Sequence, residues 1–114
     1  GVIASKEKGL VNVSIGSHLI ECISDLEVGT QVSACIRPEE VILALARVST
    51  SARNTFSGTI SSMVTTGPLV RVAVDCGFPL VALITTRTTE EMGLHKGMEV
   101  YASFKATGVH IVQG

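Results

Sequence analysis

The chain has 114 residues, of which 46% are hydrophobic, and its formal net charge is -1. This length corresponds to one domain, or to two very small domains that share a core. A net charge close to zero provides no field that would steer the protein onto nucleic acid or an acidic membrane, so any affinity for anions has to be local.

The cysteines and histidines show no pattern typical of a metal site. Cys22, Cys35 and Cys76 are widely spaced among apolar residues, which is typical of free thiols in a reducing cytosol. The three histidines never approach the spacing of paired metal ligands. No apolar run reaches membrane-spanning length and no signal-like start is present. We therefore expect a cytoplasmic chain without a cofactor or a metal centre.

Short apolar alternations bounded by Gly, Pro and Ser recur along the chain, which is typical of a sandwich or barrel of short strands. The strands are expected near residues 1–5, 10–15, 18–23, 31–36, 41–45, 55–65, 69–76, 80–85, 99–105 and 109–112. The sequence thus predicts an all-β fold.

The two sets of five strands resemble two copies of one unit. The matching segments are 1–5 with 58–62, 10–13 with 69–72, and 29–41 with 97–109 across one small gap. Half a chain is too small to bury a good core alone, so the copies should pack together. We expect a first repeat at residues 1–47 and a second at 48–114. The first-repeat counterpart of residues 51–54 would lie upstream of Gly1, so we expect the chain to be part of a longer protein.

The second repeat carries extra residues around 85–94, where the first passes through the short segment 24–28. Thr88 followed three places later by Glu91 indicates a capping box, and Gly93 is a natural stop. We expect a single helical turn, present in the second repeat only, whose amino end would seat an anion. The alternative is that Thr88 merely caps a surface turn.

Hydrogen-bond donors and positive charges lie in three segments of the second repeat, residues 51–58, 84–88 and 104–106. Arg53 offers a planar fork of donors to an oxyanion, and the flanking Ser51 and Ala52 add hydroxyl and backbone N–H donors. Lys105 adds a point charge suited to a dianion. The alternatives are a surface arginine and a solvated strand-end lysine, and Arg37 at the matching place in the first repeat supports the latter.

Thr85 and Thr88 carry hydroxyls three places apart at the start of the inserted turn, although threonines in strands are usually only strand formers. None of the three segments supplies a free acid. A pocket made only of donors suits a fully ionised oxyanion, whereas protonated phosphate would require a carboxylate acceptor. This chemistry predicts binding and not catalysis.

Residues 51–112 resemble the molybdate-binding Mop family. The matching motifs are Ser51-Ala52-Arg53-Asn54, Phe56-x-Gly58, Ala82-x-Ile84-Thr85-x-x-Thr88, Leu94-x-x-Gly97-x-x-Val100-x-Ala102 and Lys105-Ala106. The first half resembles the related TOBE-type accessory domain of import ABC ATPases. That match rests on Ile36-Arg37-Pro38-Glu39-Glu40-Val41.

The resemblance implies tandem OB-like five-stranded barrels and a homodimer whose interface holds molybdate or tungstate. In the family, the Ser-Ala-Arg loop of one chain meets the Thr, Ser/Thr and Lys positions of its partner. The implied ligand residues are Ser51, Ala52 and Arg53 on one side and Thr85, Thr88, Lys105 and Ala106 on the other. Thr88 stands where many members have Ser, and its extra methyl group could narrow the pocket.

A degenerate first repeat beside an intact second resembles the regulatory tail of a molybdate or tungstate importer ATPase. The resemblance then implies feedback (trans-) inhibition, a nucleotide-binding domain in the same chain, permease subunits as partners and a place at the inner face of the cell membrane. The alternative is a stand-alone, molbindin-like storage protein. Molybdate, tungstate and sulfate are not distinguished.

Two further classes are disfavoured by the residues present. The barrel alone suggests single-stranded nucleic acid binding, but the stacking aromatics and basic groove that such binding uses are missing. Neither a nucleophile elbow nor a metal-ligand cluster nor a phosphate-cradling glycine loop with its lysine is present, so this segment is not expected to be an enzyme.

Overall fold

The computed structural model describes all 114 residues, and every expected strand is present. The strands are β1 (Val2–Glu7), β2 (Leu10–Ile15), β3 (His18–Ile23), β4 (Val32–Ile36), β5 (Ile42–Ala44), β6 (Asn54–Thr66), β7 (Leu69–Asp75), β8 (Pro79–Thr85), β9 (Glu99–Phe104) and β10 (Val109–Gln113). The helices are the 3-10 turns η1 (Pro38–Glu40) and η2 (Ala106–Gly108) and the α-helix α1 (Thr86–Met92). The predicted all-β class is confirmed.

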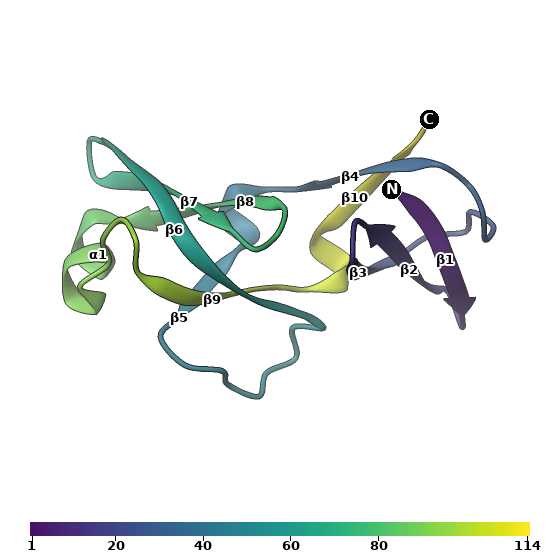
Figure 1. Cartoon of the computed structure of the whole chain (residues 1–114), viewed down its shortest axis with the longest axis horizontal. Helices are drawn as coiled ribbons and strands as arrows, with labels where there is room; N and C mark the ends of the chain where they lie inside the picture. The colour runs from purple at the N-terminus through teal and green to yellow at the C-terminus, as the bar shows by residue number, and fades with distance from the viewer.

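The strands form two antiparallel lobes along a molecule of 43 × 28 × 22 Å (Figure 1). One lobe holds the sheet β1-β2-β3, and the other holds the sheet β5-β9-β6-β7-β8. A third ladder pairs β10 with β4. The fifth strand of each repeat therefore pairs with the fourth strand of the other repeat. The repeat boundary after residue 47 stays a prediction, since strands from both sides of it enter the same sheets.

Equivalent backbone hydrogen bonds occur at matching positions of the two predicted repeats. The N–H of Ile3 donates to the Thr30 carbonyl oxygen at 3.0 Å, and the N–H of Ile60 donates to the Met98 carbonyl oxygen at 2.9 Å. In both repeats the register of the first hairpin shifts directly after that isoleucine. The two copies thus share a bulge and a closing contact as well as a sequence pattern.

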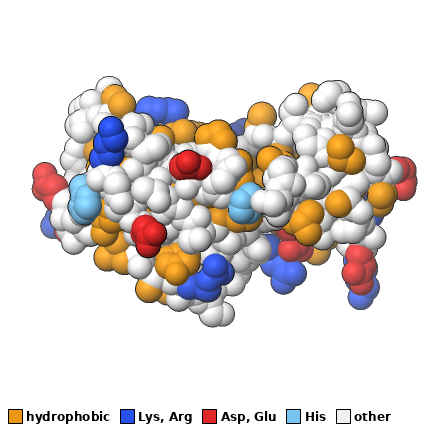
Figure 2. All heavy atoms as spheres, viewed as in Figure 1, with side chains coloured by type: hydrophobic (Ala, Val, Ile, Leu, Met, Phe, Trp, Pro, Cys, Tyr) orange, Lys and Arg blue, Asp and Glu red, His pale blue; other side chains and the backbone are white.

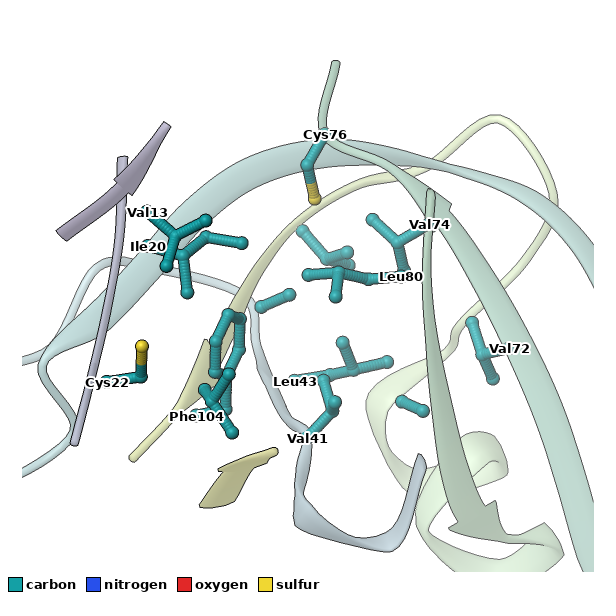
Figure 3. Packing of buried hydrophobic residues seen from close by; sticks show 14 of the residues in the cluster. Val13, Ile20, Cys22, Val41, Leu43, Val72, Val74, Cys76, Leu80 and Phe104 are labelled. Carbon is teal, nitrogen blue, oxygen red and sulfur yellow. The ribbon is translucent and has the colours of Figure 1, made fainter. Parts of the chain in front are cut away.

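One hydrophobic core of 20 buried residues runs through both repeats. Phe104 of β9 is 1% exposed and lies between Val13 and Ile20 of the first repeat on one side and Leu43 of β5 on the other (Figure 3). Because side chains of the first repeat surround Phe104 of the second, the two repeats share one core.

Gly58 of the Phe56-x-Gly58 motif allows β6 to approach the end of β7 closely. A Cβ atom at Gly58 would lie 2.7 Å from the Asp75 carbonyl oxygen and 2.7 Å from the Cys76 Sγ atom. The Asp75 carbonyl belongs to the backbone of β7 and cannot rotate away, so a larger residue at position 58 would push β6 and β7 apart.

Three phenylalanines of the second repeat and one histidine of the first meet at the junction of the lobes. The His18 ring lies edge-on to Phe56 and Phe78, with ring centres 5.7 and 5.3 Å away. Phe56 in turn stacks on Phe104 at 6.0 Å. Offset and edge-to-face ring pairs stabilise by more than the apolar area that they bury, so these contacts favour this particular arrangement of the two lobes.

The connection between β5 and β6 passes over the outside of the large sheet. Within it, the Arg47 guanidinium carbon lies 5.3 Å from the centre of the Tyr101 ring on β9. A cation held over an aromatic face is attracted by the ring quadrupole, so this contact ties the connection to the sheet.

Surface charges of both signs are scattered over the face shown in Figure 2, without a large patch of one sign. This distribution agrees with the formal net charge of -1. None of the helices is long and apolar enough to cross a lipid bilayer.

We predict that only one cysteine reacts quickly with a thiol reagent in the folded protein. Cys22 and Cys76 are 0% and 5% exposed, whereas Cys35 is exposed. Burial, and secondarily the neighbouring Glu21 and Asp75 charges, raises the pKa of each buried thiol to about 11, so little reactive thiolate forms at pH 8.

Labelling at pH 8 followed by absorbance should therefore give one fast thiol per chain and two more only after denaturation in urea. A Cys35→Ser variant serves as the control and should lose the fast phase. Three fast thiols in the folded wild-type protein would contradict the buried placement of Cys22 and Cys76.

Candidate anion-binding site

The Ser51–Arg53 loop and the residues after β9 line one groove, which we call the basic groove. This concavity of about 340 Å³ is lined by Leu10, Ile23, Ser51, Arg53, Lys105, Ala106 and Thr107. A hollow of about 230 Å³, lined in part by Ala52, also contains Ser51 and Lys105 and adds the acidic Glu39 and Glu40. Five of the seven predicted site residues thus lie together in a single chain.

Strand register explains why Lys105 lies beside the loop. Asn54 at the start of β6 pairs with Phe104 at the end of β9, so the residues just outside this pair, Arg53 and Lys105, are neighbours. The resemblance places the lysine on the chain opposite the Ser-Ala-Arg loop, which stays a prediction, and within one chain Lys105 also lies beside Ser51.

Lys105 occupies the same structural position as Arg37 of the first repeat. Each is the residue before a 3-10 turn, with φ and ψ of -78° and 149° for Lys105 and -68° and 135° for Arg37. Both side chains are exposed. The repeat alignment therefore pairs two cations correctly, one at the end of β9 and one at the end of β4.

The predicted helical segment is present but is capped differently from expectation. Thr85, not Thr88, is the N-cap: its Oγ1 atom accepts a hydrogen bond from the Thr88 N–H at 3.1 Å and donates to the Thr88 Oγ1 at 3.0 Å. Glu91 does not close a capping box but pairs with Arg87 at 3.2 Å. The helix has seven residues rather than one turn, and it ends as predicted at Gly93, whose φ is 65°.

Thr85 and Thr88 do not line the basic groove of their own chain. In Figure 1, α1 lies at one end of the long axis, while the connection before β6 and the turn η2 lie nearer the middle. The first-repeat counterpart of Thr85 is Ile23, because Ile23 pairs with Leu10 as Thr85 pairs with Leu69. Within one chain the groove therefore has an isoleucine where a hydroxyl is expected.

An acidic side chain also contacts the loop, which corrects the expectation of a site without acids. The Arg53 Nε atom lies 3.3 Å from Oε1 and 3.1 Å from Oε2 of Glu21 on β3. The Glu21 side chain is 16% exposed and that of Arg53 is 65% exposed. Sequence reasoning missed Glu21 because it is a single acidic residue in a mostly apolar strand, 32 positions away from Arg53.

Asn54 attaches the Ser51–Arg53 loop to β3 through two hydrogen bonds. The residue is 2% exposed, its Oδ1 accepts from the Glu21 N–H at 2.7 Å, and its Nδ2 donates to the Glu21 carbonyl oxygen at 2.8 Å. The amide therefore satisfies both backbone groups of one residue on an edge strand, as a neighbouring strand would. The motif contained Asn54, but nothing in the sequence indicated which backbone it would bind.

The largest surface hollow is elsewhere and has the wrong chemistry for an anion. Its volume is about 720 Å³, and its lining includes Asp75 and Glu99 but no lysine or arginine. We therefore place the candidate site in the smaller basic groove, where Arg53 and Lys105 supply positive charge.

Two five-stranded barrels that exchange strands and share one core define a tandem OB-like β domain. The family model of the TOBE domain matches residues 50–111, which is more than half of the chain. The chain belongs to the TOBE domain family, as the sequence resemblance predicted.

Curated relatives and a solved structure agree with this assignment. The chain is 40% identical over 86 residues to the molybdate/tungstate import ATP-binding protein WtpC of Pyrococcus horikoshii, covering 75% of this chain and 25% of the relative. It is 35% identical over 104 residues to the molybdenum-pterin-binding protein MopA of Rhodobacter capsulatus, covering 87% of this chain and 39% of the relative. The chain thus spans about a quarter of the length of WtpC.

The fold is that of the cytoplasmic molybdate-binding protein ModG, solved with molybdate bound. The TM-score is 0.84 at 24% sequence identity, and the match covers 96% of this chain and 89% of ModG. This likeness extends over both barrels and confirms the tandem OB-like architecture.

We predict that Asn54→Ala lowers the free energy of unfolding by about 1–3 kcal/mol, because it leaves a buried N–H and a buried carbonyl of Glu21 unpaired. The matched control is Asn12→Ala, which removes a single exposed hydrogen bond to Ser5 and should change stability by less than about 0.5 kcal/mol. Urea denaturation followed by circular dichroism measures both. Equal losses in the two variants would show that the Asn54 amide does not fasten β6 to β3.

Proposed function

We propose that this domain binds molybdate or tungstate in the basic groove. The observation that carries the proposal is the convergence of Arg53 and Lys105 on one concavity that also contains the Ser51 hydroxyl. Tetrahedral dianions offer only acceptors, so two cations and a hydroxyl match them in charge and in hydrogen bonding. The names of WtpC, MopA and ModG support the same ligand class. The ligand would be the only small molecule required, with no cofactor.

A homodimer would complete the donor set. Ser51, Ala52, Arg53, Lys105 and Ala106 lie together in one chain, but Thr85 and Thr88 lie outside that groove, where Ile23 takes the equivalent place. We therefore assign the two threonine hydroxyls of each ligand site to a second copy of the domain. An oxyanion held by both copies binds the dimer better than the separate chains, and it shifts the equilibrium toward the bridged state.

The bridged state would regulate transport. The chain spans a quarter of WtpC, an import ATP-binding protein, and the repeats at 1–47 and 48–114 would form the regulatory tail behind a nucleotide-binding domain. When internal molybdate or tungstate is plentiful, the bridged tails hold the ATPase subunits in a non-productive arrangement at the permease. This is feedback (trans-) inhibition at the cytoplasmic face of the cell membrane, and the chemistry of ATP hydrolysis belongs to the other domain.

A stand-alone binding or storage protein is the second candidate. The observation that favours it is the match to MopA, which covers 87% of this chain against 75% for WtpC. The two candidates differ in ATP hydrolysis by the native full-length protein. The regulatory candidate predicts hydrolysis that molybdate suppresses, and the storage candidate predicts no hydrolysis.

Isothermal titration calorimetry with molybdate, tungstate and sulfate tests ligand binding directly. We expect heat with the first two anions, accompanied by a doubling of mass in light scattering if the chain alone is monomeric. Absence of heat with both molybdate and tungstate, at concentrations where the dimer persists, would rule out the proposed function.

We predict that Lys105→Ala weakens molybdate binding about ten- to hundredfold, or roughly 1.5–3 kcal/mol, because it deletes a charge-assisted contact to a dianion. The control is Lys96→Ala, an exposed lysine outside the groove, which should bind as wild type. An unchanged affinity for Lys105→Ala in the same titration would show that the site lies elsewhere.

We also predict complementation between two defective variants if each site spans two chains. Thr88→Val removes a hydroxyl from one side of the site, and Lys105→Ala removes the cation from the other. A mixed dimer has one site with both defects and one intact site, so mixing the variants should restore tight molybdate binding at one site per mixed dimer. Mixtures that bind no better than the separate variants would contradict a two-chain site.

A further inference from the structure

We propose that Glu21 is a positioning residue for the oxyanion, which acts by holding Arg53 through its Nε atom. The inference deepens the proposed function and rests on it. Arg53 has five donor hydrogens, one on Nε and four on the two terminal nitrogens. Glu21 takes the Nε donor with both carboxylate oxygens, at 3.3 and 3.1 Å, and leaves the terminal nitrogens available to a ligand.

Glu21 is the anchored partner of this pair. Its side chain is 16% exposed, against 65% for Arg53, and the Asn54 amide holds both its N–H and its carbonyl oxygen. A guanidinium on a free, exposed side chain samples many rotamers, and a ligand has to select one of them at an entropic cost. The contact to an anchored carboxylate removes part of that cost before the ligand arrives.

The carboxylate lies on the other concavity that Arg53 lines, away from the basic groove. Glu21 lines a hollow of about 350 Å³ with Lys6 and Lys8, and it is absent from the lining of the basic groove. Arg53 contributes to both. An anion beside Ser51 and Lys105 would therefore meet Arg53 directly and would meet the Glu21 charge only at longer range, where solvent screens it.

Two effects of Glu21 on affinity oppose each other and can be separated. Its negative charge repels a dianion whether or not Arg53 is present, whereas its positioning effect requires Arg53. We therefore expect Glu21→Gln to weaken molybdate binding about three- to tenfold when Arg53 is intact. In an Arg53→Ala background, the same substitution should leave binding unchanged or improve it, because only the repulsion is removed.

Calorimetric titration of the native protein with molybdate, in the four combinations of residues at positions 21 and 53, measures whether the effect of Glu21→Gln on affinity depends on Arg53. Glu21→Asp retains the charge but shortens the reach to Nε, so it should weaken binding as Glu21→Gln does. Glu27→Gln is the matched control, since Glu27 pairs with Lys6 and lines neither concavity. It should bind as wild type.

Circular dichroism melts test whether each variant is folded, and Glu21→Asp replaces Glu21→Gln if the latter unfolds. Wild-type binding with equal or tighter binding by Glu21→Gln would overturn the positioning role. An effect of the same sign and size in both Arg53 backgrounds would overturn it as well. Failure of the wild-type protein to bind molybdate or tungstate would instead overturn the proposed function.

Discussion

The exchange of β5 and β10 between the two repeats is the constraint on which the rest of the structure depends. Without this exchange, β9 of the second repeat and β4 of the first would each have an unpaired edge. The buried cluster around Phe104 would also lose the side chain that β5 contributes to it. Each repeat therefore completes its strand pairing with the last strand of the other. The two lobes are thus joined by exchanged strands and by one common hydrophobic core.

The candidate site is a consequence of this interlocked arrangement. The segment that returns from the exchanged β5 to β6 carries the Ser51–Arg53 loop, and the β6–β9 register places Lys105 beside it. Asn54 and Glu21 then attach the loop to the first repeat through backbone and side-chain contacts. Ser51, Arg53 and Lys105 lie just outside the paired ends of β6 and β9, so the strand pairing fixes their backbones beside one another.

Local pattern and family motif predicted the elements and most of the groove residues, but not how they combine. Alternation and Gly93 marked strands and the helix end because both signals are local. Thr85 and Thr88 are equally good caps by composition, and only the backbone path decides between them. The proximity of Lys105 to the Ser51–Arg53 loop follows from the strand register, and the contact between Glu21 and Arg53 joins residues of different repeats. Neither long-range relation leaves a periodic signal in one sequence.

The contact between Arg47 and Tyr101 has a practical consequence. The protein has no tryptophan and a single tyrosine, so its near-ultraviolet absorption and intrinsic emission are dominated by one ring. That ring lies on β9 and contacts the connection that continues into the Ser51–Arg53 loop. In these 114 residues Tyr101 therefore reports on the connection before β6, and spectroscopy can follow this segment without an introduced dye.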